Sequence, residues 1–286
     1  GILERNRGGE HWHMDETRWL VFAETEGKEG HRWWLWVCVA ADTCVYLLDA
    51  SRSATVPHNH IGAAAKGILN ADRYSAYKTL ENVQIAFCWA HVRRDFMRVR
   101  DGYPRLHGWG LSWVEKIEEL FAINARLELR ALPSAFAAED QILRQAMATM
   151  SETRDLELAD AGLHEAQRKA LKSLLNHWKG LSIFVDRPEI PMDNNESERR
   201  LRNPIIGRKN YYGSGSVWSG RLSAMLFTLF QTLLLNRIDP KKFMLAYFQA
   251  CAHNGGRPPG DMVAWLPWNL TSEQKAAWLY PKQQSP

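Results

Sequence analysis

The chain has 286 residues, of which 45% are hydrophobic and 24% are charged, and this balance is typical of a folded protein with one large core or two smaller ones. The longest apolar run, from Ala224 to Leu235, is interrupted by polar residues and is too short to cross a bilayer, and the N-terminus shows no apolar signal segment. The four cysteines form no C-x-x-C pair. We therefore expect a cytoplasmic protein with no membrane partner.

The net charge of +4 is unevenly distributed along the chain. Residues 199–221 contain six basic residues and no acid, and residues 91–105 contain five arginines against two aspartates. Residues 111–165 carry eleven acids against five basic residues. A basic surface facing a polyanion, with an acidic lobe held away from it, would produce this pattern, and DNA is the natural polyanion.

The first 50 residues predict three consecutive strands. Residues 11–23 alternate loosely and are rich in Trp, Val and Phe, and residues 31–50 contain two more strand-like runs separated by a break at 41–43. The short connections favour a meander.

Two further strands follow. Residues 56–66 predict a short helix, and the next stretch predicts a strand that ends at Asp72. Residues 83–90 predict a fifth strand, which passes directly into a basic helix at residues 91–100. Five strands joined by helical crossovers favour an α/β layer over a barrel or a sandwich.

The second half of the chain is predominantly helical in pattern. Residues 111–182 show apolar stripes with helical spacing and predict a helical insertion. Residues 220–236 are apolar on nearly every face and predict a buried helix, and Asp239 with Pro240 predicts the start of another that ends near Cys251. The tail from residue 255 is rich in proline and polar residues, so we expect it to be loosely ordered.

Residues 193–215, DNNESERRLRNPIIGRKNYYGSG, concentrate acids, amides, cations and glycines. Asp193 or Asn194 can cap a helix, and Pro204 is expected to end that helix near Arg202, after two to three turns.

The helical spacing assigns different roles to the two glutamates of this helix. Glu198 shares a face with Leu201 and is the better candidate for a buried carboxylate, whereas Glu196 is expected to be a solvated partner of Arg200. The alternative is a surface helix with two ion pairs, from Glu196 to Arg200 and from Glu198 to Arg202.

Asp15, Asp72 and Glu198 fall on the first strand, at the end of the fourth strand and on the helix after the insertion. Mg²⁺ prefers oxygen ligands, so carboxylates converging from these elements could hold a metal pair over a phosphodiester. Spacing alone does not distinguish these acids from the others in the chain.

Several blocks, in this order, resemble the insertion-sequence-66 family of bacterial transposases. The matching blocks are MDET (14–17), ADRYSAY (71–77), CWAHVRRDF (88–96), DNNESERRLR (193–202), GRKNYYGSGS (207–216) and LNRIDPKKFM (235–244). The resemblance implies a ribonuclease-H-like fold, α/β, with a five-stranded mixed sheet, flanking helices and a helical insertion before the catalytic glutamate. It implies a core in two parts (1–110 and 186–254), an insertion (111–185) and a tail (255–286).

The resemblance also implies the chemistry. Asp15, Asp72 and Glu198 match the family's DDE triad, which binds two Mg²⁺ ions, with Mn²⁺ as a substitute, and performs phosphodiester hydrolysis and strand transfer. The implied partners are DNA, both transposon ends and target, further copies of the chain on DNA, and accessory proteins of the same element. The acidic insertion is expected to position Glu198 without lining the metal site.

The chain departs from the family pattern in two places. The family usually has glycine after its second aspartate, where this chain has Arg73, a residue that could alter the backbone or contact a phosphate. The family's N-terminal helical and DNA-binding regions have no counterpart here, so recognition of transposon ends is expected to lie elsewhere. Two alternatives therefore stay open: a metal-dependent nuclease without strand transfer, and a decayed fragment that binds nucleic acid.

The basic blocks supply the candidate DNA contacts. Phosphate contact is expected of the cations beside the site and near the Gly-rich loop, because such a loop can approach a phosphate backbone closely. The two tyrosines could either pack or stack on bases. The residues in this set are Arg93, Arg94, Arg199, Arg202, Arg208, Lys209, Tyr211 and Tyr212.

Two other residue groups are given structural roles. The tryptophans in strand-like runs, Trp33, Trp34, Trp36 and Trp89, are expected in the core. Cys88 and His91 have C-x-x-H spacing but no second ligand pair, which argues against a zinc site.

Overall fold

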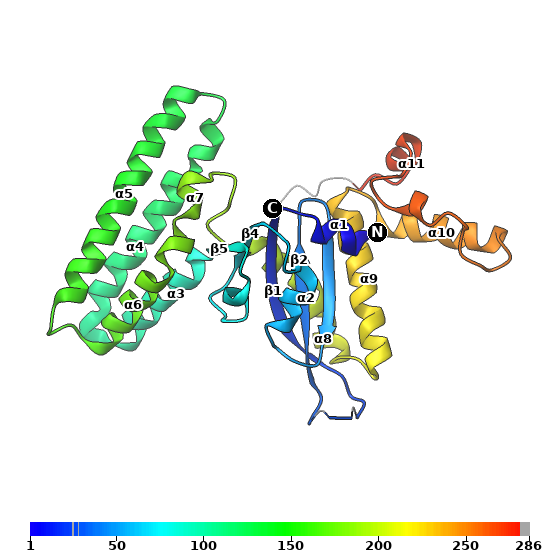
Figure 1. Cartoon of the computed structure of the whole chain (residues 1–286), viewed down its shortest axis with the longest axis horizontal. Coiled ribbons are helices and arrows are strands. Elements are labelled where there is room, and N and C mark those ends of the chain that lie inside the picture. The colour runs from blue at the N-terminus through cyan, green and yellow to red at the C-terminus, as the bar shows by residue number, and fades with distance from the viewer. Residues whose placement is uncertain (25, 28, 281–286) are drawn as a thin grey trace. The chain divides into compact units, whose positions relative to one another are not determined.

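The structure is a computed structural model that describes residues 1–280 except residues 25 and 28. The chain divides into two compact units. The first comprises Gly1–Ile68, Thr79–Val83 and Asn195–Pro286, and the second comprises Leu69–Lys78 and Gln84–Asn194. Each is described in turn (Figure 1).

A mixed five-stranded sheet with flanking helices confirms the predicted α/β class and is consistent with a ribonuclease-H-like fold. The strand order is β3-β2-β1-β4-β5, and the first three strands form the predicted antiparallel meander. The strands are β1 (His11–Leu20), β2 (Arg32–Val39), β3 (Cys44–Asp49), β4 (Gly67–Ala71) and β5 (Val83–Phe87).

The first unit contains most of the sheet and the helices at the two ends of the chain. Its helices are α1 (Ile2–Arg7), α2 (Thr55–Ile61), α8 (Asn195–Tyr211), α9 (Val217–Leu235), α10 (Pro240–His253) and α11 (Ser272–Ala277). Helices α8 and α9 cover one face of the meander, and the core between them contains Trp19, Leu35, Val37 and Leu201. Burial of this apolar surface holds α8 and α9 in place.

Helix α9 is not buried on every face, contrary to the sequence-based prediction. The side of α9 that packs on β3 buries Thr228 and Thr232, whereas Met225 is 61% exposed. An apolar helix sequence therefore does not fix how many of its faces are covered.

The tail is more ordered than its composition suggests. Asp239 caps α10 as predicted, accepting hydrogen bonds from the backbone N–H groups of the second and third helical residues. Beyond α10, Trp265 and Trp278 stack with ring centroids 6.1 Å apart, and both rings contact Phe243 of α10. These partly buried rings pack against a small core that contains Leu233, Phe243 and Leu270, which orders the segment. The last part of the tail, residues 281–286, lies outside the described residues.

The second unit is largely helical (green in Figure 1). Its helices are α3 (Trp89–Gly102), α4 (His107–Asn124), α5 (Pro133–Ala159), α6 (Glu165–Leu181) and α7 (Ile183–Asp186). Their apolar stripes meet in one core, in which Phe96 stacks on Trp113 at 5.0 Å between ring centroids. Trp89 is fully buried in the same core, and Trp33 and Trp36 are buried in the sheet, as predicted, whereas Trp34 is only partly buried and lies under Arg52.

Among the described residues, no helix combines the length and the hydropathy that a transmembrane span requires.

Candidate active site

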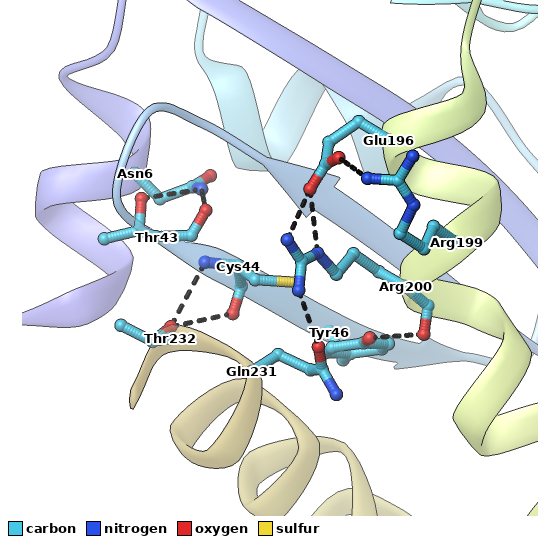
Figure 2. A network of polar contacts seen from close by, with 9 residues as sticks. All are labelled: Asn6, Thr43, Cys44, Tyr46, Glu196, Arg199, Arg200, Gln231 and Thr232. Carbon is cyan, nitrogen blue, oxygen red and sulfur yellow. Dashed lines mark hydrogen bonds and ion pairs between the residues drawn. The ribbon is translucent and has the colours of Figure 1, made fainter. Parts of the chain in front are cut away.

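Asp15 lies in the middle of β1, on the face of the sheet that α8 covers. Its cross-strand neighbour is Val37 of β2, and the neighbour of Val37 on β3 is Tyr46. Residues directly opposite one another on paired strands point to the same face, so these three side chains form a row across the sheet. The hydroxyl of Tyr46 reaches α8 and donates a 2.8 Å hydrogen bond to the carbonyl oxygen of Arg200 (Figure 2). Asp15 therefore points to the α8 side.

Contacts at both ends of α8 show that the helix follows β1. Near the helix start, Glu196 lines the same hollow of about 480 Å³ as His11 and His13 of β1. Near the helix end, Arg208 donates a 3.2 Å hydrogen bond to the hydroxyl of Thr17 and another to the carbonyl oxygen of the next residue. The first turns of α8, which contain the predicted catalytic glutamate, consequently lie along the part of β1 that precedes Thr17.

Glu198 is half-buried, so the prediction of a buried carboxylate is wrong on this point. The inward face of α8 is formed by Ser197, Leu201 and Pro204, all of which are buried. Glu198 lies at the border of that face because Ser197 takes the inward position one residue earlier. A half-buried carboxylate can be reached by an ion or a substrate from outside.

Glu196 forms the predicted ion pair with Arg200, one turn later. The carboxylate lies 2.5 Å from the Arg200 guanidinium and 3.2 Å from that of Arg199. Its side chain is only 27% exposed, so this acid is less solvated than predicted. Arg200 also donates to the side-chain oxygen of Gln231 in α9 at 3.2 Å (Figure 2), which joins the two helices.

Helix α8 continues through Pro204 to Tyr211, contrary to the prediction that it ends near residue 202. Proline has no backbone N–H and therefore cannot bond the carbonyl four residues earlier, which is that of Arg200. The hydroxyl of Tyr46 supplies a donor to this carbonyl. Burial raises the pKa of Tyr46 well above its usual range, so the hydroxyl keeps its proton. The sequence could not show this compensation, because the donor comes from a distant strand.

Asp72 follows β4 directly and belongs to the helical unit. One of its carboxylate oxygens accepts a 2.8 Å hydrogen bond from the backbone N–H of Tyr74, which closes a local turn and orients the side chain. One oxygen of Asp15 likewise accepts from the backbone N–H of Glu16 at 2.8 Å. That three carboxylates, Asp15, Asp72 and Glu198, converge on a metal pair stays a prediction.

Asn70 holds the chain that precedes α8, a role that no sequence motif indicates. It is fully buried in β4, and its amide donates to the carbonyl oxygens of Pro191 at 2.9 Å and Asp193 at 3.1 Å. The backbone N–H of Trp89 donates to the carbonyl oxygen of Met192, which lies between Pro191 and Asp193 in the chain. These bonds fix the segment that leads into α8. An amide within an apolar strand is the available sequence signal, because a buried amide needs hydrogen-bond partners.

The candidate DNA-binding cations differ in how far other groups already engage them. Arg93 pairs with Glu118, Arg199 pairs with Glu196, and Arg208 is bound to the β1 backbone. Three others are exposed and form no ion pair within the described part of the chain: Arg94, Arg202 and Lys209. These three are better placed than the engaged cations to meet phosphates.

The Gly-rich loop after α8, which the sequence analysis expects to approach a phosphate backbone, lies close to the backbone of β1. A Cβ atom on Gly213 would lie 2.3 Å from the carbonyl oxygen of Leu20, so only glycine fits at this position. The next residue, Ser214, donates its backbone N–H to Leu20 at 2.8 Å. Of the two tyrosines before this loop, Tyr211 lies against Trp19 with 6.1 Å between ring centroids, whereas Tyr212 is 68% exposed. Tyr212 is therefore the better candidate for stacking.

Comparison with known proteins gives a consistent picture. A family model described as "Transposase IS66 family" matches residues 2–222. The uncharacterized protein y4qI of Sinorhizobium fredii is 31% identical over 298 residues, which cover 94% of this chain and 52% of that protein. Two further uncharacterized proteins of the same organism, y4jD and y4hP, are 28% and 25% identical over 84% and 91% of this chain. The chain spans about half the length of the curated relatives it matches.

Proposed function

The chain belongs to the IS66 family of transposases, and we propose that it is a catalytic core that hydrolyses and joins phosphodiester bonds of DNA. The observation that carries this proposal is the course of α8 along β1, on the face to which Asp15 points. Because α8 follows this course, Asp15 and Glu198, which is in the first turn of α8, lie on the same side of the sheet. Asp72, at the end of the strand next to β1, is the third member of the proposed triad.

The donor set fits a hard divalent ion. Asp15, Asp72 and Glu198 offer only oxygen, the element that Mg²⁺ prefers, and Mn²⁺ accepts the same ligands. All three residues are partly exposed, so an ion and a phosphodiester can reach them. When bound, a pair of such ions would activate a water or a 3′-hydroxyl and stabilise the leaving oxygen.

Other groups of the chain hold the three carboxylates in position. The bonds from backbone N–H groups to Asp15 and Asp72 restrict how each side chain rotates. The contacts of Arg200 with Glu196 and Gln231 hold the first turns of α8 and hence the backbone of Glu198. Preorganised ligands of this kind lose less conformational entropy when an ion binds.

We further propose DNA as the partner, bound mainly through its phosphates by Arg94, Arg202 and Lys209. Contacts of this kind carry little sequence information, so binding should be largely independent of sequence. Other copies of the chain and accessory proteins of the same element are proposed to assemble on the DNA.

A cleavage and joining assay in Mg²⁺ or Mn²⁺ tests the proposal. Wild-type chain is incubated with labelled duplexes that carry the ends of the element, and the products are resolved on denaturing gels. Asp15→Asn, Asp72→Asn and Glu198→Gln should each abolish cleavage while leaving DNA binding nearly unchanged, because each keeps the side-chain shape and removes a metal ligand. Cleavage without joining would favour a nuclease, and binding without cleavage in the wild type would favour a non-catalytic DNA-binding protein.

A further inference from the structure

Arg73, immediately after Asp72, turns its side chain into the helical unit. Its guanidinium donates to the hydroxyl of Ser173 in α6 at 2.7 Å and to the carbonyl oxygen of His91 in α3 at 3.1 Å. It also lies 2.6 Å from the carboxylate of Asp95 in α3. The side chain is only 16% exposed, and all of these partners belong to the same compact unit.

Through these contacts Arg73 links α3 and α6 to the short segment that follows β4, residues 72–76. Residues 72–76 form neither helix nor strand, so side chains add to the few backbone hydrogen bonds that hold the chain after β4. At the far end of this segment, Tyr77 is fully buried. At the near end the anchor is Arg73, whose planar guanidinium can bond several acceptors in fixed directions.

The ion pair between Asp95 and Arg73 also affects the charge near Asp72. A cation beside a metal-binding carboxylate competes with the metal ion for the negative charge. Pairing with Asp95, which also lies 3.3 Å from Arg98, holds the guanidinium of Arg73 on α3 and offsets part of its charge. The arginine can therefore fix the backbone of Asp72 without forming an ion pair with the Asp72 carboxylate.

We propose that Arg73 is a positioning residue for the metal site: it fastens the loop that carries Asp72 to α3 and α6, and Asp95 keeps its charge away from Asp72. The proposal rests on the proposed function, in which Asp72 is a metal ligand. It gives α6, the last long helix of the helical insertion, a role in supporting Asp72.

Binding of Mn²⁺ to the purified 286-residue chain, followed by electron paramagnetic resonance, tests this inference without measuring activity. Loss of a residue that orients a metal ligand typically weakens metal binding by about 10- to 100-fold. Arg73→Ala should therefore raise the Mn²⁺ dissociation constant at least about tenfold, and Arg73→Lys should recover part of the loss. Asp95→Asn should also raise it, because the freed guanidinium can then pair with Asp72.

Arg154→Ala is the matched control. Arg154 is a buried arginine of the same unit, with a 5% exposed side chain that pairs with Asp155 and lies over the ring of Trp178. Its removal should lower the unfolding temperature, measured by circular dichroism, without changing Mn²⁺ affinity. An Arg73→Ala chain that loses stability in the same way but binds Mn²⁺ like the wild type would show a purely structural role and overturn the inference.

The outcomes separate this inference from the proposed function. If the wild type binds no Mn²⁺, or if Asp72→Asn does not weaken binding, the proposed function fails and the inference fails with it. If Asp72→Asn weakens binding and Arg73→Ala does not, only the inference fails. Should Arg73→Ala not fold, Ser173→Ala and Asp95→Asn replace it, and unchanged Mn²⁺ affinity in both would also overturn the inference.

Discussion

The hydroxyl of Tyr46 donates to the carbonyl oxygen of Arg200, the one carbonyl of α8 that Pro204 deprives of its helical donor. A strand thus completes the hydrogen bonding of the helix that carries the proposed catalytic glutamate. Because the same carbonyl would accept from a backbone N–H if residue 204 were not proline, the contribution of Tyr46 should depend on Pro204.

The first prediction tests this dependence. Tyr46→Phe should lower the free energy of unfolding by about 1–3 kcal/mol, because it leaves a carbonyl without its donor. In a Pro204→Ala background, where residue 204 regains an N–H, the same change should cost clearly less. Urea unfolding of the four chains measures the coupling, with Tyr212→Phe as an exposed control. Equal costs in both backgrounds would contradict the compensation.

The second prediction compares the two glutamates of α8. Glu198→Gln should abolish DNA cleavage and leave the unfolding free energy nearly unchanged, because it removes a proposed metal ligand. Glu196→Gln should keep most of the activity but lower the unfolding free energy by about 1 kcal/mol, because the partly buried pair with Arg200 loses its charge. Cleavage assays and urea unfolding of both variants are the measurements. The reverse activity pattern would show that the glutamates have been assigned wrongly.

Pro204 and Glu198 also show how far the sequence could predict the structure. The three-stranded meander follows from alternating apolar residues, and the N-cap of α10 follows from local chemistry, so both were predictable. The length of α8 was not predictable, since it depends on a donor from Tyr46. The burial of Glu198 was misjudged because a three-turn helical pattern cannot distinguish the centre of a face, here Ser197, from its border.

The candidate site could be predicted only in part, for a similar reason. Asp15 and Glu198 are visible as acids in characteristic blocks, but their shared side of the sheet depends on strand register and on where α8 packs. Asn70 and Arg73 act through contacts that are remote in sequence, with Asp193 and Ser173 respectively. No local pattern encodes such contacts.

The third prediction separates DNA contact from strand anchoring. Lys209→Ala should weaken DNA binding and reduce the slope of log K against log salt by about 0.9, the value for one phosphate contact, with no change in stability. Arg208→Ala should instead lower the unfolding free energy by about 1–2 kcal/mol, because it removes the bonds to β1. Fluorescence anisotropy at several salt concentrations and urea unfolding distinguish the two. An unchanged salt slope for Lys209→Ala would remove this residue from the DNA surface.

The fourth prediction concerns pH. Burial, with a smaller contribution from nearby Arg7, lowers the pKa of His60 to about 4. In the unfolded chain the pKa is about 6.5, so the unfolded state binds a proton first as the pH falls. Stability contributed by neutral His60 is therefore present above pH ~6.5 and is lost between pH ~6.5 and ~4, by at most about 3 kcal/mol. The Nε2 atom of His60 lies 2.6 Å from the side-chain oxygen of Asn6, while its buried Nδ1 has no partner among the described residues.

Urea unfolding at several pH values between 6.5 and 4 measures this loss. His60→Gln should flatten the pH dependence of stability in that window, because it removes the titrating group. His253→Gln, at an exposed histidine of α10, should keep the slope of the wild type. An identical slope in the wild type and His60→Gln would contradict the assignment.

The two buried threonines of α9 have a consequence for how copies of the chain can meet. The hydroxyl of Thr228 accepts from the backbone N–H of Tyr46 at 2.8 Å, and that of Thr232 accepts from the backbone N–H of Cys44 at 3.1 Å. Strand β3 is an outer strand of the sheet, and its outward N–H groups would otherwise offer a template to another strand. With these donors occupied from within the chain, edge-to-edge joining of two sheets is blocked at Cys44 and Tyr46. Another copy of the chain could therefore not extend the sheet at this part of the β3 edge, and any contact there would have to use side chains.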